Sequence, residues 1–227
     1  MVATEVPAGA ADVFGAALDQ ACRYAELLAT DGVTRGLIGP RETDRLWERH
    51  LLNCAVVTEL LPQDGRLVDI GSGAGLPGIV LAMLRPSLEV TLLEPLLRRA
   101  VFLQECVTEL GLENATVLRA RAEDKEGAQL RADIATARAV APLGRLVGWA
   151  VRLLRPGGQL LAIKGQSAEA ELAAARPVLS RLGVRSAEVL QAGHGRVISA
   201  TTVVRVVTGG HGREERAGAQ RSRRGVA

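Results

Sequence analysis

The segment from Leu67 to Gly78 constrains the fold of this chain more than any other. An apolar run ends in an acid, Asp69, and continues into a loop with three alternating glycines before Pro77. A buried strand that stops at a glycine-rich turn and leads into a helix is how a doubly wound sheet builds a nucleotide pocket. Glycine tolerates positive φ and lets a ligand approach the main chain, and proline fits the first turn of a helix. The segment therefore predicts a Rossmann-like α/β fold with a ligand site at this turn.

The surrounding sequence predicts a helical extension followed by alternating strands and helices. Two amphipathic helices are expected before the glycine loop, over residues 10–30 and 41–61. The alternation that follows is typical of a parallel sheet, and its last two strands form a hairpin. The expected strands cover residues 68–70, 88–93, 115–118, 133–136, 159–163, 186–190 and 197–207, and the later helices cover 97–110, 143–154 and 168–182. We expect a helical extension (1–62), a domain with a mixed seven-stranded sheet (63–208) and a basic disordered tail (209–227).

Composition excludes several classes of protein. No apolar run reaches the roughly 18–20 residues that span a bilayer. Residues 1–11 contain an acid and no basic residue, unlike a secretory signal. Cys22, Cys54 and Cys106 are scattered and lack CxxC spacing, which indicates reduced thiols and argues against a zinc site. We therefore expect a cytoplasmic protein with neither a bound metal nor a membrane segment.

The net charge is concentrated at one end of the chain. The formal charge is +3, and residues 209–227 alone hold five arginines and two glutamates, which accounts for all of it. The remaining 208 residues are neutral overall. Any polyanion that binds residues 1–208 must therefore contact local basic patches, because these residues carry no net positive charge.

The glycine loop fits two cofactor classes. The spacing Gly73-x-Gly75-x-x-Gly78 satisfies the dinucleotide fingerprint, whereas Asp69-x-Gly71-x-Gly73-x-Gly75 satisfies the pattern of S-adenosylmethionine (AdoMet) enzymes. Glu94, at the end of the next expected strand, can accept hydrogen bonds from the ribose hydroxyls of either cofactor.

Two further observations favour AdoMet. The loop after residues 115–118 offers Ala122 as an apolar floor and Glu123 as an acceptor for an adenine amino group. A Pro-Gly-Gly turn and a closing hairpin leave no space for the second domain that nicotinamide dehydrogenases use, although an NAD oxidoreductase stays an alternative. In the AdoMet register, Gly78 becomes a residue of helix packing.

Several motifs occur in a fixed order around the glycine loop. They are Leu46-Trp47-Glu48-Arg49-His50-Leu51-Leu52-Asn53, Arg98-Arg99-x-x-Phe102-Leu103, Leu112-Glu113-Asn114, Ala137-Arg138-Ala139 and Leu161-Ala162-Ile163-Lys164-Gly165-Gln166. Over residues 10–207 this set resembles the RsmG (GidB) family of methyltransferases. The resemblance implies AdoMet-dependent methylation of a guanine N7 in 16S rRNA, either free or in the small ribosomal subunit, by a class I methyltransferase that we expect to be monomeric.

The resemblance also implies roles for particular residues. Gly71 and Leu76 would contact the cofactor at the glycine loop, Ala122 and Glu123 would hold its adenosine end, and Arg138 would complete the pocket. Candidates for contact with RNA are Arg49, His50, Arg138 and Lys164. Guanine N7 carries a free lone pair and no proton, so no general base is needed and no catalytic residue is assigned. A small-molecule methyltransferase and a non-catalytic ribosome-binding factor stay open as alternatives.

Overall fold

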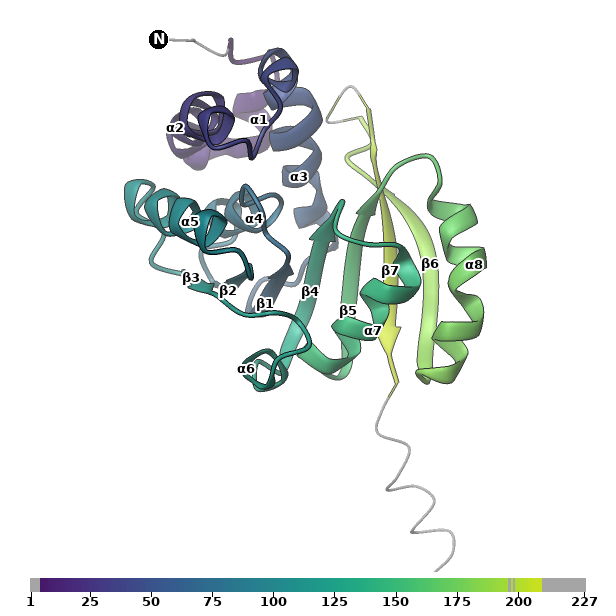
Figure 1. Ribbon diagram of the computed structural model, residues 1–227. Helices are drawn as coiled ribbons and strands as arrows, with labels where there is room; N and C mark the ends of the chain where they lie inside the picture. The colour runs from purple at the N-terminus through teal and green to yellow at the C-terminus, as the bar shows by residue number, and fades with distance from the viewer. Residues whose placement is uncertain (1–4, 196, 198, 210–227) are drawn as a thin grey trace, which may run out of the picture.

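The computed structural model describes residues 5–195, 197 and 199–209 of the chain. Its centre is a seven-stranded sheet with the order β3-β2-β1-β4-β5-β7-β6, in which β7 is antiparallel to both of its neighbours (Figure 1). The strands are β1 (Gly65–Ile70), β2 (Leu88–Leu93), β3 (Ala115–Leu118), β4 (Ala132–Arg138), β5 (Leu154–Lys164), β6 (Val184–Ala192) and β7 (Thr201–Thr208). This mixed sheet confirms the fold class that the sequence predicts. The predicted disordered tail (209–227) lies, after Gly209, outside the described residues.

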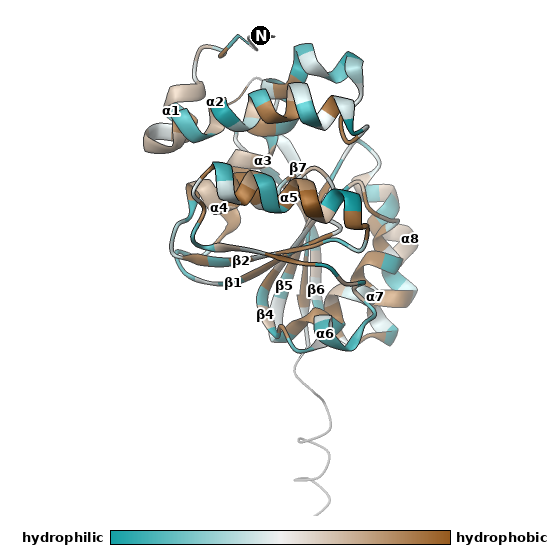
Figure 2. Cartoon of the chain, turned by 60° about the vertical axis from the view of Figure 1, so that its left-hand side comes forward, coloured by the Kyte–Doolittle hydropathy of each residue, from teal (hydrophilic) through white to brown (hydrophobic). Residues whose placement is uncertain are grey.

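Helices cover both faces of the sheet and continue into an outer layer. Those that follow the strands are α4 (Gly78–Leu84), α5 (Leu97–Glu109), α6 (Lys125–Ala128), α7 (Leu143–Leu153) and α8 (Ala168–Arg181). The N-terminal helices lie outside α4 and α5, so this side of the molecule has two helical layers (Figure 2). The side of the sheet under α4 and α5 shares one continuous apolar core with the extension, and α7 and α8 pack on a second core. The extension is therefore part of the main hydrophobic core.

The extension is helical, but neither of its two predicted helices is continuous. The first divides into α1 (Ala10–Phe14), a 3₁₀ turn η1 (Gly15–Ala17), α2 (Leu18–Leu27) and a π turn η2 (Leu28–Gly32), with Gly15 at a φ of 52°. The second divides into η3 (Pro40–Arg45), η4 (Leu46–Leu52), α3 (Asn53–Ala55) and η5 (Val56–Leu60), where η4 is a π-helix. Hydrophobic spacing detects a helical stretch, but it does not distinguish 3₁₀, α and π winding.

The observed strand boundaries differ most from the predicted ones where strand pairing is irregular. β5 begins at Leu154, because the predicted Pro-Gly-Gly turn lies inside the strand at a register shift opposite Ala132 and Ile134. β7 begins at Thr201, four residues later than expected. Among the described residues, no helix is both long enough and apolar enough to cross a membrane.

Candidate cofactor and RNA site

A cavity of about 480 Å³ lies where the carboxyl ends of β1, β2 and β4 meet. This edge of a parallel sheet, at the point where the strand order reverses, is where open α/β folds bind ligands. The volume is within the range of small-molecule sites. Leu37 and Ile38 of the N-terminal extension close one side. The other lining residues are Ile70, Gly71, Ser72, Gly73, Ala74, Leu76, Leu93, Glu94, Pro95, Leu96, Arg99, Ala120, Arg121, Ala122, Glu123, Arg138, Ala139, Val140 and Trp149.

The glycine loop forms the floor of this cavity. Gly71 and Gly73 have φ values of 66° and 59°, in a region of backbone conformation that residues other than glycine rarely adopt. The backbone N–H groups of Gly71 and Ser72 donate to the carbonyl oxygen of Leu93, at 2.8 and 3.1 Å, which fixes the turn against β2. A Cβ at Gly73 would meet only the Gly71 carbonyl oxygen, at 3.7 Å, so the space beside this glycine is open for a ligand.

Asp69 and Gly75, both expected to contact the cofactor, do not line the cavity. Asp69 is buried, and its carboxylate accepts hydrogen bonds from the Gly78 backbone N–H (3.1 Å) and the Thr136 hydroxyl (3.0 Å). Burial raises the pKa of this carboxyl to about 6. A Cβ at Gly78 would lie 2.4 Å from Leu92 Cδ2, in agreement with the expected packing role of Gly78. Asp69 thus joins β1, β4 and α4 beneath the loop.

Glu94 provides a buried acceptor in the cavity wall. It is 1% exposed, and its carboxylate accepts from the backbone N–H groups of Gly73 and Leu96, each at 3.0 Å. A carboxylate has about four acceptor positions, so two remain for hydroxyl groups. The Arg99 guanidinium lies 3.9 Å from the Glu94 carboxylate and lines the same cavity. The sequence did not predict this role for Arg99. A polar acceptor of this kind beside an open glycine loop fits a ribose.

The loops after β3 and β4 line the next part of the cavity wall. Ala122 is buried, and Glu123 is exposed with its carbonyl oxygen accepting from Arg152 at 3.0 Å. Both line the cavity as predicted, and Trp149 of α7 lies in the same wall without having been predicted. These residues provide an apolar surface with polar edges, which suits an adenine.

Arg138 ends β4 and connects the cavity to the N-terminal extension. Its guanidinium donates to the Arg49 carbonyl oxygen (3.1 Å) and to His50 Nδ1, and it lies 3.8 Å from Cys54 Sγ. His50 in turn contacts a carboxylate oxygen of Glu42 through Nε2, at 3.0 Å. Burial and the Arg138 charge lower the pKa of His50 to about 4, so the imidazole is neutral at ordinary pH. Three of the predicted substrate residues therefore form one cluster.

Lys164, the fourth predicted RNA residue, does not line the cavity. Its ammonium group donates to Glu171 (2.7 Å) and to the Ala141 carbonyl oxygen (3.0 Å), and its side chain is 10% exposed. Glu171 also accepts from the backbone N–H of Leu143. The pair holds the loop between β4 and α7, whose residue Ala139 has a φ of 56° and lines the cavity.

A second contact between the extension and the glycine loop involves Tyr24, which lies in the first of the two predicted helices. Its hydroxyl donates to the Ala74 carbonyl oxygen at 2.6 Å, although its side chain is wholly buried. Burial raises its pKa well above 10. A Cβ at Gly75 would lie 2.7 Å from this hydroxyl, so Gly75 permits the close approach of α2. The only available signal was that tyrosine occurs once in the chain.

This arrangement has the fold of the class I AdoMet-dependent methyltransferases. A SAM-dependent methyltransferase from Aquifex aeolicus superposes with a TM-score of 0.56 at 18% identity, covering 75% of this chain and 99% of the other. A putative S-adenosyl-L-methionine-dependent methyltransferase from Methanococcus maripaludis gives 0.58 at 13% identity, covering 82% and 93%. At such identities the likeness establishes the fold.

Sequence comparison then identifies the family. The family model described as rRNA small subunit methyltransferase G (GidB) matches residues 17–198. The ribosomal RNA small subunit methyltransferase G of Thermobifida fusca is 64% identical over 202 residues, covering 88% of this chain and 85% of the relative. The protein of the same name from Streptomyces coelicolor is 57% identical, covering 90% and 85%. The chain belongs to the rRNA small subunit methyltransferase G family, which confirms the resemblance found in the sequence.

Proposed function

We propose that this protein transfers a methyl group from AdoMet to N7 of a guanine in 16S rRNA. The observation that carries the proposal is family membership over most of the chain together with an intact cavity at the expected edge of the sheet. We also propose that the protein acts in the cytoplasm as a monomer.

The residues of the cavity fit AdoMet. Glu94 would accept hydrogen bonds from the ribose hydroxyls, and the wall formed by Ala122, Glu123 and Trp149 would hold the adenine. Gly71 and Gly73 would lie along the cofactor where the main chain must be approached closely. Arg138 would pair with the cofactor carboxylate, because an arginine is a strong bidentate partner for that group. Bound AdoMet supplies an electrophilic methyl group.

Methyl transfer to guanine N7 requires the protein to position the two reactants and requires no proton transfer. Guanine N7 is nucleophilic without deprotonation, so alignment and exclusion of water supply the catalysis. Glu94, the buried carboxylate of the described cavity lining, accepts from two backbone N–H groups, and we assign its remaining acceptor positions to the ribose hydroxyls and not to proton transfer. Leu37 and Ile38 of the extension narrow the cavity where the target base would enter.

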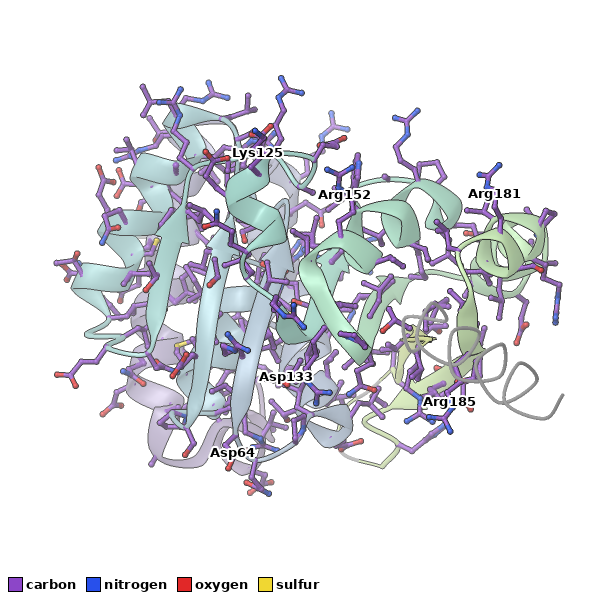
Figure 3. The ribbon with its side chains drawn as sticks, turned by 90° about the horizontal axis from the view of Figure 1, so that it is seen from below. Asp64, Lys125, Asp133, Arg152, Arg181 and Arg185 are labelled. Carbon is purple, nitrogen blue, oxygen red and sulfur yellow. The ribbon has the colours of Figure 1, made fainter. Side chains whose placement is uncertain are left out.

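Phosphate contacts would come from the extension at the same edge of the sheet. Arg49 is half-exposed and lies beside Arg138, although its guanidinium also pairs with Glu42 at 3.1 Å. By contrast, β7 ends at Thr208 next to Arg155 and Gly158, at the opposite end of the sheet, which Figure 3 shows from below with Asp64 and Asp133 labelled. The described part of the chain therefore ends, at Gly209, on the side of the sheet away from the cavity.

Methylation of defined RNA substrates tests the proposal. The full-length protein is incubated with labelled AdoMet and one of three substrates: naked 16S rRNA, 30S particles that lack the modification, or total small metabolites. We expect label in RNA and a single cleavage site after borohydride and aniline treatment, which detects methylated guanine N7. Label without cleavage would reject N7, and label only in small metabolites would reject an RNA substrate.

A further inference from the structure

Arg138 is held in place by residues that come from far away in the sequence. The partners of its guanidinium, Arg49, His50 and Cys54, precede it by 84 to 89 residues and belong to η4 and α3. An arginine side chain with four flexible bonds loses rotamer entropy when it is fixed, so a preorganised site must supply contacts that hold it. In this protein the N-terminal extension supplies those contacts.

The protonation of His50 follows from its two neighbours. The Glu42 carboxylate can only accept a hydrogen bond, so His50 Nε2 must carry the proton. The lone pair of Nδ1 is then free to accept from Arg138 Nη2. A proton on Nδ1 would instead place two donors against each other. Glu42 therefore selects the one tautomer of His50 that can bind Arg138.

We propose that Glu42 and His50 are positioning residues that orient the Arg138 guanidinium for the cofactor and thereby link the N-terminal extension to methyl transfer. The inference rests on the proposed function in that Arg138 faces bound AdoMet. The pattern resembles metal sites, where a carboxylate fixes the tautomer and orientation of a histidine that acts on a third group. Neither residue lines the described cavity, so both act through Arg138.

The consequence for RNA concerns Glu42. Its two carboxylate oxygens are shared between Arg49 and His50, at 3.1 and 3.0 Å. A phosphate that engages Arg49 would compete for that arginine and leave Glu42 to His50 alone. The same carboxylate would thus connect an RNA contact on the surface to the guanidinium inside the cavity.

A double-mutant cycle on AdoMet affinity tests the proposal without RNA. Calorimetry on the full-length protein compares wild type with His50→Ala, Arg138→Ala and the double variant. We expect each single variant to weaken binding by about 10–100-fold, the range for such supporting partners. We expect the double variant to bind like Arg138→Ala, because His50 has nothing to orient once Arg138 is removed. The inference would be overturned if the fold-loss of AdoMet affinity in the double variant equalled the product of the two single losses. It would also be overturned if either single variant bound AdoMet as tightly as wild type.

A conservative variant separates positioning from folding. His50→Asn places a carbonyl oxygen near the position of Nδ1, so it should restore most of the affinity that His50→Ala loses, to within about threefold of wild type. Glu48→Gln, on the exposed side of η4, is the matched control and should bind like wild type. If Asn and Ala weaken binding equally, the acceptor is not what matters and the proposal fails. Because the readout is cofactor binding, absence of RNA methylation by wild type would reject only the proposed function.

Discussion

The two ends of the cofactor cavity are built in different ways. At one end, Glu94 is held by the N–H groups of Gly73 and Leu96, in the loops that follow the adjacent strands β1 and β2. At the other end, Arg138 is held by η4 and α3 of the extension, more than 80 residues earlier in the chain. The first arrangement follows from local backbone rules. The second exists only when the extension is docked, and it is where this chain differs from a generic methyltransferase fold.

The largest expected effect on the free energy of unfolding is at Asp69, beneath the glycine loop. Asp69→Ala would leave the Gly78 N–H and the Thr136 hydroxyl buried without their acceptor. An unsatisfied buried donor costs roughly 1–3 kcal/mol, so we expect a loss of about 4 kcal/mol in the free energy of unfolding, and AdoMet binding should fall with it. Urea denaturation of the variant measures the change.

Asp69→Asn is the matched control because it retains one carbonyl acceptor at nearly the same volume. We expect it to lose about half as much, roughly 2 kcal/mol. A loss below about 1 kcal/mol for Asp69→Ala would contradict the view that this carboxylate joins β1, β4 and α4.

The next effect concerns how the free energy of unfolding depends on pH, to which His50 and Asp69 contribute with opposite signs. The pKa of His50 is lowered from 6.5 to about 4 in the folded state, mainly by burial. The unfolded chain therefore takes up this proton first, and stability is lost as the pH falls from about 6.5 to 4. The pKa of Asp69 is raised from 3.8 to about 6, so its contribution has the opposite sign: it is present at low pH and is lost as the pH rises towards 6.

Comparing wild type with a variant that lacks the imidazole should isolate the His50 effect from that of Asp69. We expect the stability advantage of wild type over His50→Asn to shrink by about 3 kcal/mol between pH 7 and pH 4, at 1.36 kcal/mol per unit of pKa shift. Unfolding by urea at a series of pH values gives this difference curve, in which the titration of all other groups cancels. A flat curve would mean that His50 titrates normally and that its packing against Arg138 is loose.

What the sequence could predict divides along the same boundary. Motif spacing on consecutive strands singles out Gly71, Gly73, Glu94, Ala122 and Glu123, which all line the cavity, and also Gly75, which does not. The sheet follows from alternation of apolar runs. The contacts of Tyr24 with Ala74 and of His50 with Arg138 depend on how the extension docks on the sheet domain, and no local pattern encodes that. The contacts of Lys164 with Ala141 and Glu171 could not be predicted for a related reason, since a cation at a strand end can face either a ligand or a neighbouring loop.

A smaller effect is expected at the Glu94 end of the cavity. Glu94→Gln would keep the shape but turn an amide NH₂ toward one of the two backbone donors that the carboxylate now accepts. It would also remove the charge that attracts ribose hydroxyls. We expect AdoMet affinity to fall about 30-fold, equivalent to about 2 kcal/mol, the size of one hydrogen bond to a charged group. Calorimetry measures it, and binding within threefold of wild type would show that Glu94 shapes the loop only.

The smallest effect tests whether Lys164 serves RNA or the loop after β4. Lys164→Met keeps the aliphatic length but removes the donor to the Ala141 carbonyl oxygen and the partner of Glu171. We expect a loss of about 1 kcal/mol in unfolding free energy, because Glu171 is partly exposed and water can replace the ammonium. The salt dependence of RNA binding should be unchanged, whereas Arg49→Met should lower its slope by about one unit if Arg49 neutralises a phosphate. A reduced slope for Lys164→Met would instead place Lys164 on the RNA. The extension would then not be the main source of phosphate contacts at the cavity.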